Sequence, residues 1–275
     1  MELKYFYKKV KPEKYKLKVR YDKRKDKRPA WIKVDGLPKG VNFIRIHLGK
    51  KGKDGARIQF YKTYLPEGLF LPIDYTKEEM QRFYDKFSEI YDKELKTGGK
   101  GTAGQNLMAA NFLIKKLKKY IKKGKMLDLG AGTGLITEMF AKEGFYPITL
   151  VDYSEGMLKK AKRRKNLKGC TFLKKDIRQL NLNKKYDIVI SFFSFGSSSY
   201  FKKEELGEIL KIANKHLKKN GIFAVLGHMP LKEFKKFFKE LDSGIYDLST
   251  KRRFYTDYFI GRKKNTQKRG GKNKN

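Results

Sequence analysis

Residues 126–134 read MLDLGAGTG, and this stretch decides which kind of fold the chain adopts. Its apolar first half predicts a buried strand, and the amphipathic segment at residues 135–142 predicts a helix directly after the glycines. Gly130, Gly132 and Gly134 let the backbone turn tightly and approach a ligand closely. Because a helix N-terminus also presents free N–H groups, the stretch predicts a nucleotide-binding loop.

The glycine spacing distinguishes between classes of such loops. A dinucleotide-binding loop has the spacing G-x-G-x-x-G, whereas here an acid belongs to the motif and single residues separate the glycines. A P-loop continues with Gly-Lys-Ser/Thr, but Gly134 is followed by Leu135 and Ile136. The spacing therefore favours a ligand without a triphosphate.

Over roughly residues 80–262, the chain resembles the class I S-adenosylmethionine-dependent methyltransferases. The run SEGMLKKAKRR at residues 154–164 is similar to the S-x-x-M-L-x-x-A start of a helix in this family. Four further strand candidates follow the loop in the family's order: ITLVDY at 148–153, TFLKKDI at 171–177, YDIVIS at 186–191 and NGIFAVL at 220–226. The resemblance implies a doubly wound, mostly parallel seven-stranded sheet of the α/β class. A helix over residues 231–241 and an antiparallel hairpin, 245–250 with 254–262, would complete it.

The resemblance also implies that the cofactor is S-adenosylmethionine, and it assigns residues to it. Asp128 and the backbone of the glycine loop would hold the methionine end, and Asp152 would accept both ribose hydroxyls, because a carboxylate offers two acceptor oxygens. Asp176 and Ile177 would flank the adenine, whose other face Met157 or Tyr153 would cover. The full predicted set is Asp128, Gly130, Ala131, Gly132, Gly134, Asp152, Tyr153, Met157, Asp176, Ile177 and Ser191.

Each of these assignments has a structural alternative. Asp128 and Asp152 are also what ordinary strand-end acids look like, and an Asp before an Ile is common at the end of a strand. A methionine on an amphipathic helix, such as Met157, is typical of a hydrophobic core. The cofactor assignments therefore depend on the presence of the glycine loop in the same sequence.

The acceptor side has a weaker sequence signal, because in-line methyl transfer depends mainly on alignment and exclusion of water. The segment SFFSFGSSSY at residues 191–200 should face the methyl group, since it follows a strand at the carboxyl edge of the sheet. It lacks the prolines of enzymes that methylate exocyclic amines of bases. His228 is a candidate base, although a structural role is the alternative. The sequence has no His/Cys/Asp cluster at metal spacing, and we predict no metal.

Residues 1–75 predict a small, basic, β-rich module. Alternating segments separated by glycines predict strands at residues 15–21, 31–36, 41–49 and 56–65, with a hairpin loop at 49–55. Its aromatic residues are interleaved with Lys and Arg, a pattern that suits stacking of single-stranded bases but equally builds the core of a small β domain.

A helix is predicted over residues 74–97, similar to the F/Y-D-x-x-x-x-x-Y-D helix that covers the cofactor in methyltransferases of the ubiquinone-biosynthesis type. Tyr84 and Tyr91 lie seven residues apart, share a helix face and are candidate lid residues. The glycine-rich segment 98–105 predicts a mobile lid or a plain linker.

Charge is the second strong feature, with 67 Lys and Arg against 29 Asp and Glu, a net charge of +38. Such a field attracts nucleic acid through its phosphates, whereas a lysine-rich proteome with solvated helix faces is the alternative. Residues 263–275 form a basic tail that we expect to be disordered. The chain has no run of about 18 apolar residues, so we expect no membrane insertion and a cytoplasmic protein.

These observations predict a basic module (residues 1–75), a methyltransferase domain (76–262) and a tail (263–275). The leading acceptor hypothesis is RNA, bound by the basic surface. A small-molecule metabolite or a protein is the alternative acceptor, and a noncatalytic binding protein that retains the fold is a third hypothesis. The acceptor atom and the oligomeric state are left open by the sequence.

Overall fold

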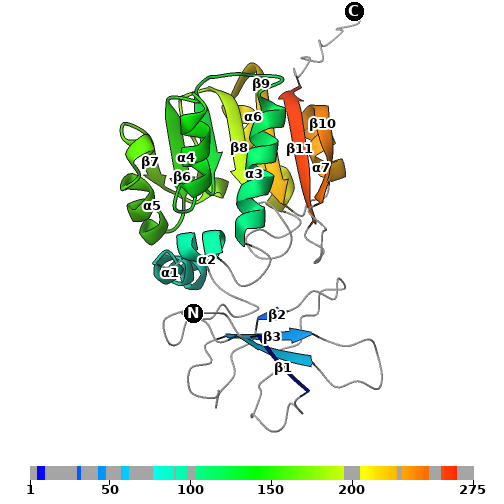
Figure 1. Ribbon diagram of the computed structural model, residues 1–275. Coiled ribbons are helices and arrows are strands. Elements are labelled where there is room, and N and C mark those ends of the chain that lie inside the picture. Colours follow the sequence, from blue (N-terminus) through cyan, green and yellow to red (C-terminus); the bar gives the residue numbers. More distant parts are fainter. Residues whose placement is uncertain are drawn as a thin grey trace, which may run out of the picture. The chain divides into compact units, whose positions relative to one another are not determined.

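A computed structural model describes residues 5–9, 30–31, 43–47, 57–61, 77–89, 91–97, 103–194, 205–227, 231–247 and 255–264 (Figure 1). The chain divides into two compact units. The first comprises residues 1–108, 132–135 and 153–164, and the second comprises residues 109–131, 136–152 and 165–275. The predicted domain boundaries at residues 75 and 262 stay predictions.

The second unit is built on a seven-stranded sheet with the order β10-β11-β9-β8-β5-β6-β7. β11 is antiparallel to both its neighbours, and the remaining pairs are parallel. The predicted doubly wound, mostly parallel sheet is therefore confirmed. Its strands are β5 (Met126–Leu129), β6 (Ile148–Asp152), β7 (Thr171–Lys174), β8 (Tyr186–Phe192), β9 (Leu217–Gly227), β10 (Phe238–Asp247) and β11 (Tyr255–Lys263).

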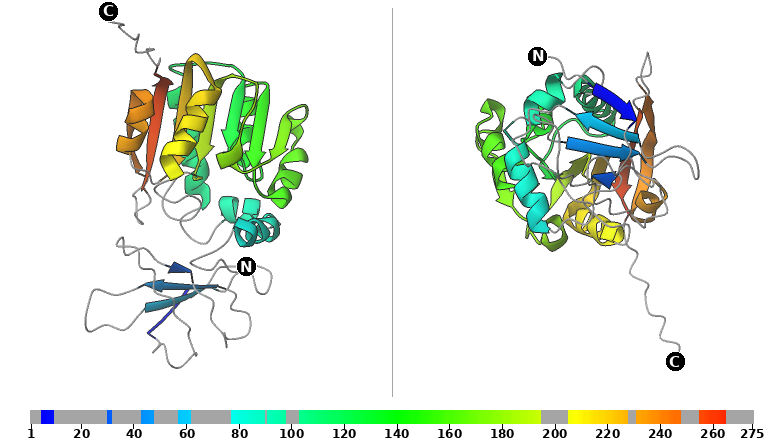
Figure 2. Two further views of the ribbon diagram at one scale, coloured as in Figure 1. Left: turned by 180° about the vertical axis from the view of Figure 1, so that it is seen from behind. Right: turned by 90° about the horizontal axis from the view of Figure 1, so that it is seen from below.

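Helices cover both faces of this sheet. One face carries α6 (Leu206–His216) and α7 (Leu231–Phe237), which are in front of the strands in the rear view of Figure 2. The opposite face carries α4 (Leu135–Lys142) and α3 (Ala103–Leu117) from Ala109 onward (Figure 1). The helices that connect successive parallel strands lie on the faces of the sheet, so a mostly parallel sheet is covered on both faces.

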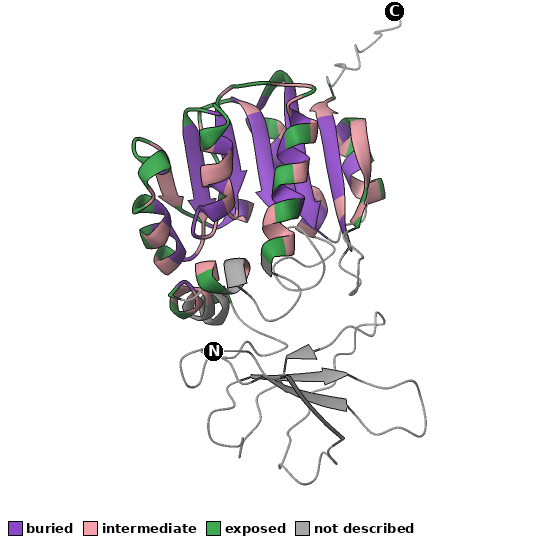
Figure 3. Ribbon diagram, in the orientation of Figure 1, coloured by how far each residue is buried: buried purple, intermediate pink, exposed green. Residues whose placement is uncertain are grey.

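The central strands are buried along their lengths, which explains their continuous apolar sequences (Figure 3). Beneath α6 and α7 the aromatic rings pack closely: Phe223 stacks on Phe238 with centroids 4.6 Å apart and on Phe234 at 5.8 Å. On the opposite face, Phe140 of α4 packs edge-on against Phe192 at 5.5 Å. These contacts pack the helices against the sheet.

The predicted helix over residues 231–241 is too long. α7 ends at Phe237, and β10 begins at Phe238. Phe238 is completely buried and stacks on Phe223 of β9, so packing of its ring against the sheet outweighs the local helical spacing. β9 is correspondingly longer than the predicted strand 220–226 and begins at Leu217.

The first unit contains an antiparallel sheet with the order β1-β4-β3-β2. Its strands are β1 (Tyr5–Lys9), β2 (Ala30–Trp31), β3 (Phe43–His47) and β4 (Arg57–Tyr61). β3 and β4 pair antiparallel, as the predicted hairpin requires. The predicted strand 15–21 and the loop 49–55 lie outside the described residues.

The same unit contains two short helices where one was predicted over residues 74–97. α1 (Lys77–Phe87) ends before Ser88, and α2 (Tyr91–Thr97) begins three residues later. The Ser88 hydroxyl donates to the Asp85 carbonyl at 2.6 Å, a local bond that competes with continuation of the helix. Of the predicted lid 98–105, residues 98–102 lie outside the described residues, and Ala103 already begins α3.

Candidate functional site

The glycine loop has the backbone conformation that its sequence predicts. Gly130, Gly132 and Gly134 have φ values of +79°, +55° and +70°, in the left-handed region that side chains disfavour. A Cβ on Gly130 would lie 2.1 Å from Ser194 Oγ, whereas the nearest atom to a Cβ on Gly132 would be Tyr91 Cε1 at 3.9 Å. A Cβ would therefore clash at Gly130, whereas at Gly132 it would meet the Tyr91 ring at ordinary contact distance.

The loop begins where the strand order of the sheet reverses. β5 pairs in parallel with β6 on one side and β8 on the other, which makes the carboxyl end of β5 the topological switch point. The Gly130 and Ala131 amides donate to the Val151 carbonyl at 2.8 and 3.0 Å, so the loop is anchored to β6. Ligands of open α/β sheets bind at such a switch point.

Asp128 is a buried acid at this position. Its side chain is only 3% exposed and accepts a hydrogen bond from the Thr137 hydroxyl. Burial raises the pKa of the Asp128 carboxyl to about 7, the Thr137 bond opposes the rise, and the nearby Asp152 charge adds to it. A carboxyl in this state gains stability from a cation placed beside it.

The Ser191 side chain forms a hydrogen bond between two strands. Its hydroxyl is completely buried and donates to the Leu129 carbonyl at 2.8 Å, which ties the ends of β8 and β5 together. Asp152 is half-buried at the end of β6, and its backbone carbonyl accepts from the Lys175 amide at 3.0 Å. The predicted cofactor contacts of both side chains stay predictions.

Asp176 has a partner that the sequence prediction did not include. It caps the short helix η4 (Ile177–Gln179), and its carboxylate accepts from Arg178 Nε at 2.9 Å. Arg178 also donates to Glu205 at 2.9 Å, so one guanidinium joins two acids. Ile177 is 7% exposed and belongs to the hydrophobic core. The arginine two residues after the aspartate was the available signal.

The first unit contains α5 (Glu155–Lys162), where Met157 is more deeply buried than Tyr153, which precedes the helix. Ser154 caps the helix by accepting from the Met157 amide at 3.1 Å. Met157 is 2% exposed, as the core alternative requires, whereas Tyr153 is half-buried. The adenine contact predicted for either side chain stays a prediction.

The candidate lid residues lie in a small aromatic cluster of the first unit. Because the helix is broken, Tyr84 and Tyr91 do not share one helix face, but Phe87 packs against both rings, at centroid distances of 6.3 and 5.3 Å. Tyr91 is the side chain that reaches Gly132. The lid role predicted for both tyrosines stays a prediction.

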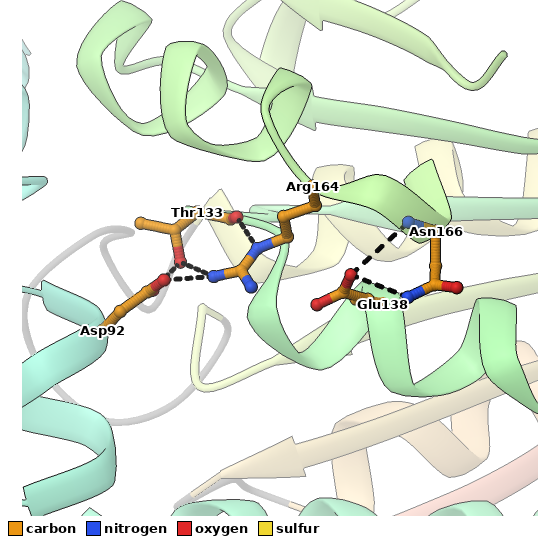
Figure 4. Close-up of polar contacts among 5 residues, drawn as sticks. All are labelled: Asp92, Thr133, Glu138, Arg164 and Asn166. Atoms are coloured by element: carbon orange, nitrogen blue, oxygen red, sulfur yellow. Dashed lines mark hydrogen bonds and ion pairs between the residues drawn. The ribbon is translucent and has the colours of Figure 1, made fainter. Parts of the chain in front are cut away.

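Aspartates next to these tyrosines bind the other elements of the first unit. Asp92 accepts from the Thr133 hydroxyl and forms an ion pair with Arg164 (Figure 4). Arg164 Nε also donates to the Thr133 carbonyl at 2.6 Å. Sequence reasoning missed this cluster, because Asp92 and Arg164 are 72 residues apart in the chain.

On the acceptor side, His228 and residues 195–204 lie outside the described residues. His216 is completely buried: the Leu182 amide donates to its Nε2 at 3.0 Å, and its Nδ1 lies 2.7 Å from the Ile212 carbonyl. Burial lowers the pKa of His216, and this bonding pattern suits the neutral ring. His216 is therefore a structural residue.

Within the part of the chain that the structure describes, no group of His, Cys, Asp and Glu residues is arranged to hold a metal ion. None of the helices described is long and apolar enough to cross a membrane.

Parts of this chain are similar in sequence to known methyltransferases. A sequence profile described as a methyltransferase domain matches residues 126–221. The malonyl-[acyl-carrier protein] O-methyltransferase of Bacillus cereus is 34% identical over 140 residues, 48% of this chain and 49% of that protein. A dTDP-3-amino-3,4,6-trideoxy-alpha-D-glucopyranose N,N-dimethyltransferase of Streptomyces venezuelae is 38% identical over 101 residues, 36% of this chain and 40% of that protein. The chain thus spans about half the length of the curated relatives it matches.

Solved structures share the fold. Magnesium protoporphyrin IX methyltransferase from Synechocystis PCC 6803, with S-adenosylhomocysteine bound, has a TM-score of 0.54 and 14% identity, and the match covers 68% of this chain and 99% of that one. An N-methyltransferase from Bradyrhizobium japonicum, also with S-adenosylhomocysteine, has a TM-score of 0.50 and 12% identity, covering 58% and 87% of the two chains. At these identities the likeness concerns the fold.

Proposed function

We propose, from the premise that this chain belongs to the class I S-adenosylmethionine-dependent methyltransferase family, that it transfers a methyl group from this cofactor to an anionic acceptor. The observation that carries the proposal is the buried Asp128 followed by the left-handed Gly130, at the switch point of the sheet. This is the position where ligands of doubly wound sheets bind.

The residues present suit the cofactor. Its amino-acid end carries an ammonium group, and Asp128 is a buried carboxyl whose raised pKa would fall beside a cation. Gly132 adopts a left-handed φ of +55° and meets only the Tyr91 ring at its Cβ position, at 3.9 Å, so its backbone suits close approach by a ligand. Asp152, half-buried at the end of β6, would accept the ribose hydroxyls.

When bound, S-adenosylmethionine supplies a methyl group on a sulfonium, from which an aligned nucleophile can displace it. The chain's own contribution is alignment and exclusion of water rather than covalent chemistry. The proposed cofactor residues hold the donor in place, and the acceptor binds at the same carboxyl edge of the sheet.

For the acceptor, we favour a carboxylate on an acyl carrier. Several relatives are named malonyl-[acyl-carrier protein] O-methyltransferases, although the match covers about half of their length. A carboxylate is already ionised at neutral pH and needs no general base. The net charge of +38 would draw such an anionic partner toward the protein.

RNA is the second candidate acceptor, and the same positive charge favours it. The relatives named above give it no support, since they are named for an acyl carrier protein and an amino sugar. The two candidates differ in how they respond to nuclease, which makes them separable in one assay.

The test uses the full chain with methyl-labelled S-adenosylmethionine. Malonyl-loaded acyl carrier protein, total RNA, other proteins and metabolites are offered in parallel, each at several salt concentrations. Base-labile label on the carrier, as a methyl ester would give, supports the favoured acceptor, and nuclease-sensitive label supports RNA. Absence of transfer to every acceptor, together with no binding of the cofactor, would overturn the proposed function.

A further inference from the structure

The chain repeats the dipeptide Tyr-Asp at residues 84–85 and 91–92, and each aspartate binds another element of the first unit. Asp85 of α1 accepts from Ser154 Oγ at 2.6 Å and from the Gly156 amide at 2.8 Å, both at the N-terminus of α5. Asp92 of α2 accepts from the Thr133 hydroxyl in the glycine loop. The two acids therefore attach α1 to α5, and α2 to the loop.

Attachment at the first point leaves no room for a side chain. A Cβ on Gly156 would lie 2.6 Å from the Asp85 carbonyl oxygen and 2.8 Å from Ser88 Oγ. Contacts below 3.0 Å force the backbone apart, since the atom met is a main-chain oxygen. The backbone of α1 thus lies directly on the first turn of α5.

Attachment at the second point depends on Arg164. This side chain is 12% exposed, forms an ion pair with Asp92 and donates from Nε to the Thr133 carbonyl at 2.6 Å (Figure 4). The Thr133 hydroxyl meanwhile donates to Asp92. The planar guanidinium holds the loop backbone and the helix carboxylate in one fixed geometry. We name Asp92, Thr133 and Arg164 the Asp92 clamp.

The clamp determines where Tyr91 lies, because Tyr91 precedes Asp92 in the chain. The Tyr91 ring is the nearest group to the position of a Cβ on Gly132, at 3.9 Å. Phe87 supports that ring edge-on from α1, with centroids 5.3 Å apart. An aromatic ring is thereby held against Gly132 of the glycine loop.

We propose that the Asp92 clamp holds Tyr91 over the glycine loop and thereby slows release of the bound cofactor. The inference deepens the proposed function and rests on it. Asp92, Thr133 and Arg164 are positioning residues: they act on the cofactor through Tyr91 and the loop backbone. With the clamp intact, α2 and the loop move together, and with it broken, Tyr91 leaves Gly132.

The first experiment measures the dissociation rate of S-adenosylhomocysteine from the full chain by stopped-flow displacement. Asp92→Asn and Arg164→Met are each expected to raise this rate roughly tenfold or more and to raise KM for S-adenosylmethionine, while kcat changes less than about threefold. The double variant should be little worse than either single variant, because both break the same contact. Glu89→Gln, an exposed acid in the same segment, is the matched control and should keep the wild-type rate.

Hydrogen exchange separates clamp opening from misfolding. In Asp92→Asn, amides of α2 should exchange faster while those of β5 keep their wild-type rates. Arg164→Lys keeps the charge but not the fork and should fall between wild type and Arg164→Met. Gly156→Ala displaces α1, and with it the Phe87 ring that supports Tyr91, without touching the clamp. It should therefore also accelerate release.

The outcomes distinguish the two levels of the argument. Wild-type binding of S-adenosylhomocysteine together with unchanged release from folded Asp92→Asn and Arg164→Met overturns the clamp alone. Failure of the wild type to bind S-adenosylhomocysteine overturns the proposed function, and the cofactor role of the clamp with it.

Discussion

Asp128 and Asp176 are both nearly buried at strand ends of the same sheet, 3% and 8% exposed, yet their surroundings differ. Asp128 is met by a neutral hydroxyl, that of Thr137, and burial raises the pKa of its carboxyl to about 7. Asp176 is met by the guanidinium of Arg178, which also binds Glu205. Among the described residues, Asp176 has a cation as a partner in the fold, whereas the side-chain partner of Asp128 is the Thr137 hydroxyl.

The difference concerns how much each acid would gain from a bound cation, and the adenine contact predicted for Asp176 stays a prediction. A carboxylate paired with a guanidinium has its charge compensated in the protein, so it contributes to folding. A buried carboxyl met only by a hydroxyl gains most from an external cation. On this argument Asp128 is the stronger cofactor candidate of the two, although the sequence presents both simply as strand-end acids.

The largest expected effect comes from removing the charge of Asp128. Its pKa is raised on folding from 3.8 to about 7, so its contribution to stability is fully present below pH 4 and is lost as pH rises to about 7. The loss amounts to about 4 kcal/mol, from about three pKa units at 1.36 kcal/mol each. Asp128→Asn should lack this loss in urea unfolding at pH 4 to 8.

The control for this titration is Glu143→Gln, an acid that is 44% exposed and should leave the pH dependence unchanged. If Asp128→Asn loses stability with rising pH as the wild type does, the carboxyl is not the titrating group, and the contrast with Asp176 fails.

Arg178→Met tests the other half of the comparison. It leaves Asp176 buried without its guanidinium, and the free energy of unfolding should fall by about 2 to 3 kcal/mol, less than for a fully buried pair because Arg178 is 19% exposed. Lys211→Met breaks an exposed pair with Glu208 and should change stability by less than about 0.5 kcal/mol. Equal effects in urea unfolding would mean that the Arg178 pair is an ordinary surface contact.

Cofactor binding sharpens the comparison further. If the ammonium group lies beside Asp128, binding at pH 6 should release a proton and tighten as pH rises through 7. Calorimetric titration with S-adenosylhomocysteine in two buffers of different ionisation enthalpy measures the released proton. Asp128→Asn should abolish the release and weaken binding by about tenfold, or about 1.4 kcal/mol. Proton release that persists in this variant would assign it to another group.

The smallest expected effect concerns His216, whose titration overlaps that of Asp128 with the opposite sign. Burial lowers the pKa of His216 below 6.5, so its contribution to stability is present above pH 6.5 and is lost as pH falls through the folded pKa. His216→Gln should lose about 1 kcal/mol at neutral pH through a weakened hydrogen bond and should lack this acid-side loss. Urea unfolding of the variant between pH 5 and 7 would expose any remaining loss.

Much of the fold was predictable because continuous apolar strands and the glycine loop are local signals. The two helix predictions that failed did so where a single side chain outweighed the local period: Ser88 bonds back to Asp85, and Phe238 stacks on Phe223. Element boundaries depend on such packing, which a sequence window does not contain.

The residues of the candidate site also differ in whether a local sequence signal predicts them. The positive φ of Gly132 followed from its place in the motif, and the Asp176–Arg178 pair was visible two residues away. The bond from Arg164 to Asp92 joins elements 72 residues apart, and no local pattern announces it. The conformation of the glycine loop was therefore predictable, but the long-range contacts that hold the loop in place were not.

The position of β11 constrains the order in which the sheet can be assembled during synthesis. β11 is the last of the seven strands in the chain, yet it lies between β9 and β10. Until residues 255–263 have left the ribosome, β10 has no partner in the sheet, and the edge of β9 is open. A nascent chain halted before that point would carry an unpaired strand, which invites pairing with other chains, so completion of the sheet must follow translation of β11.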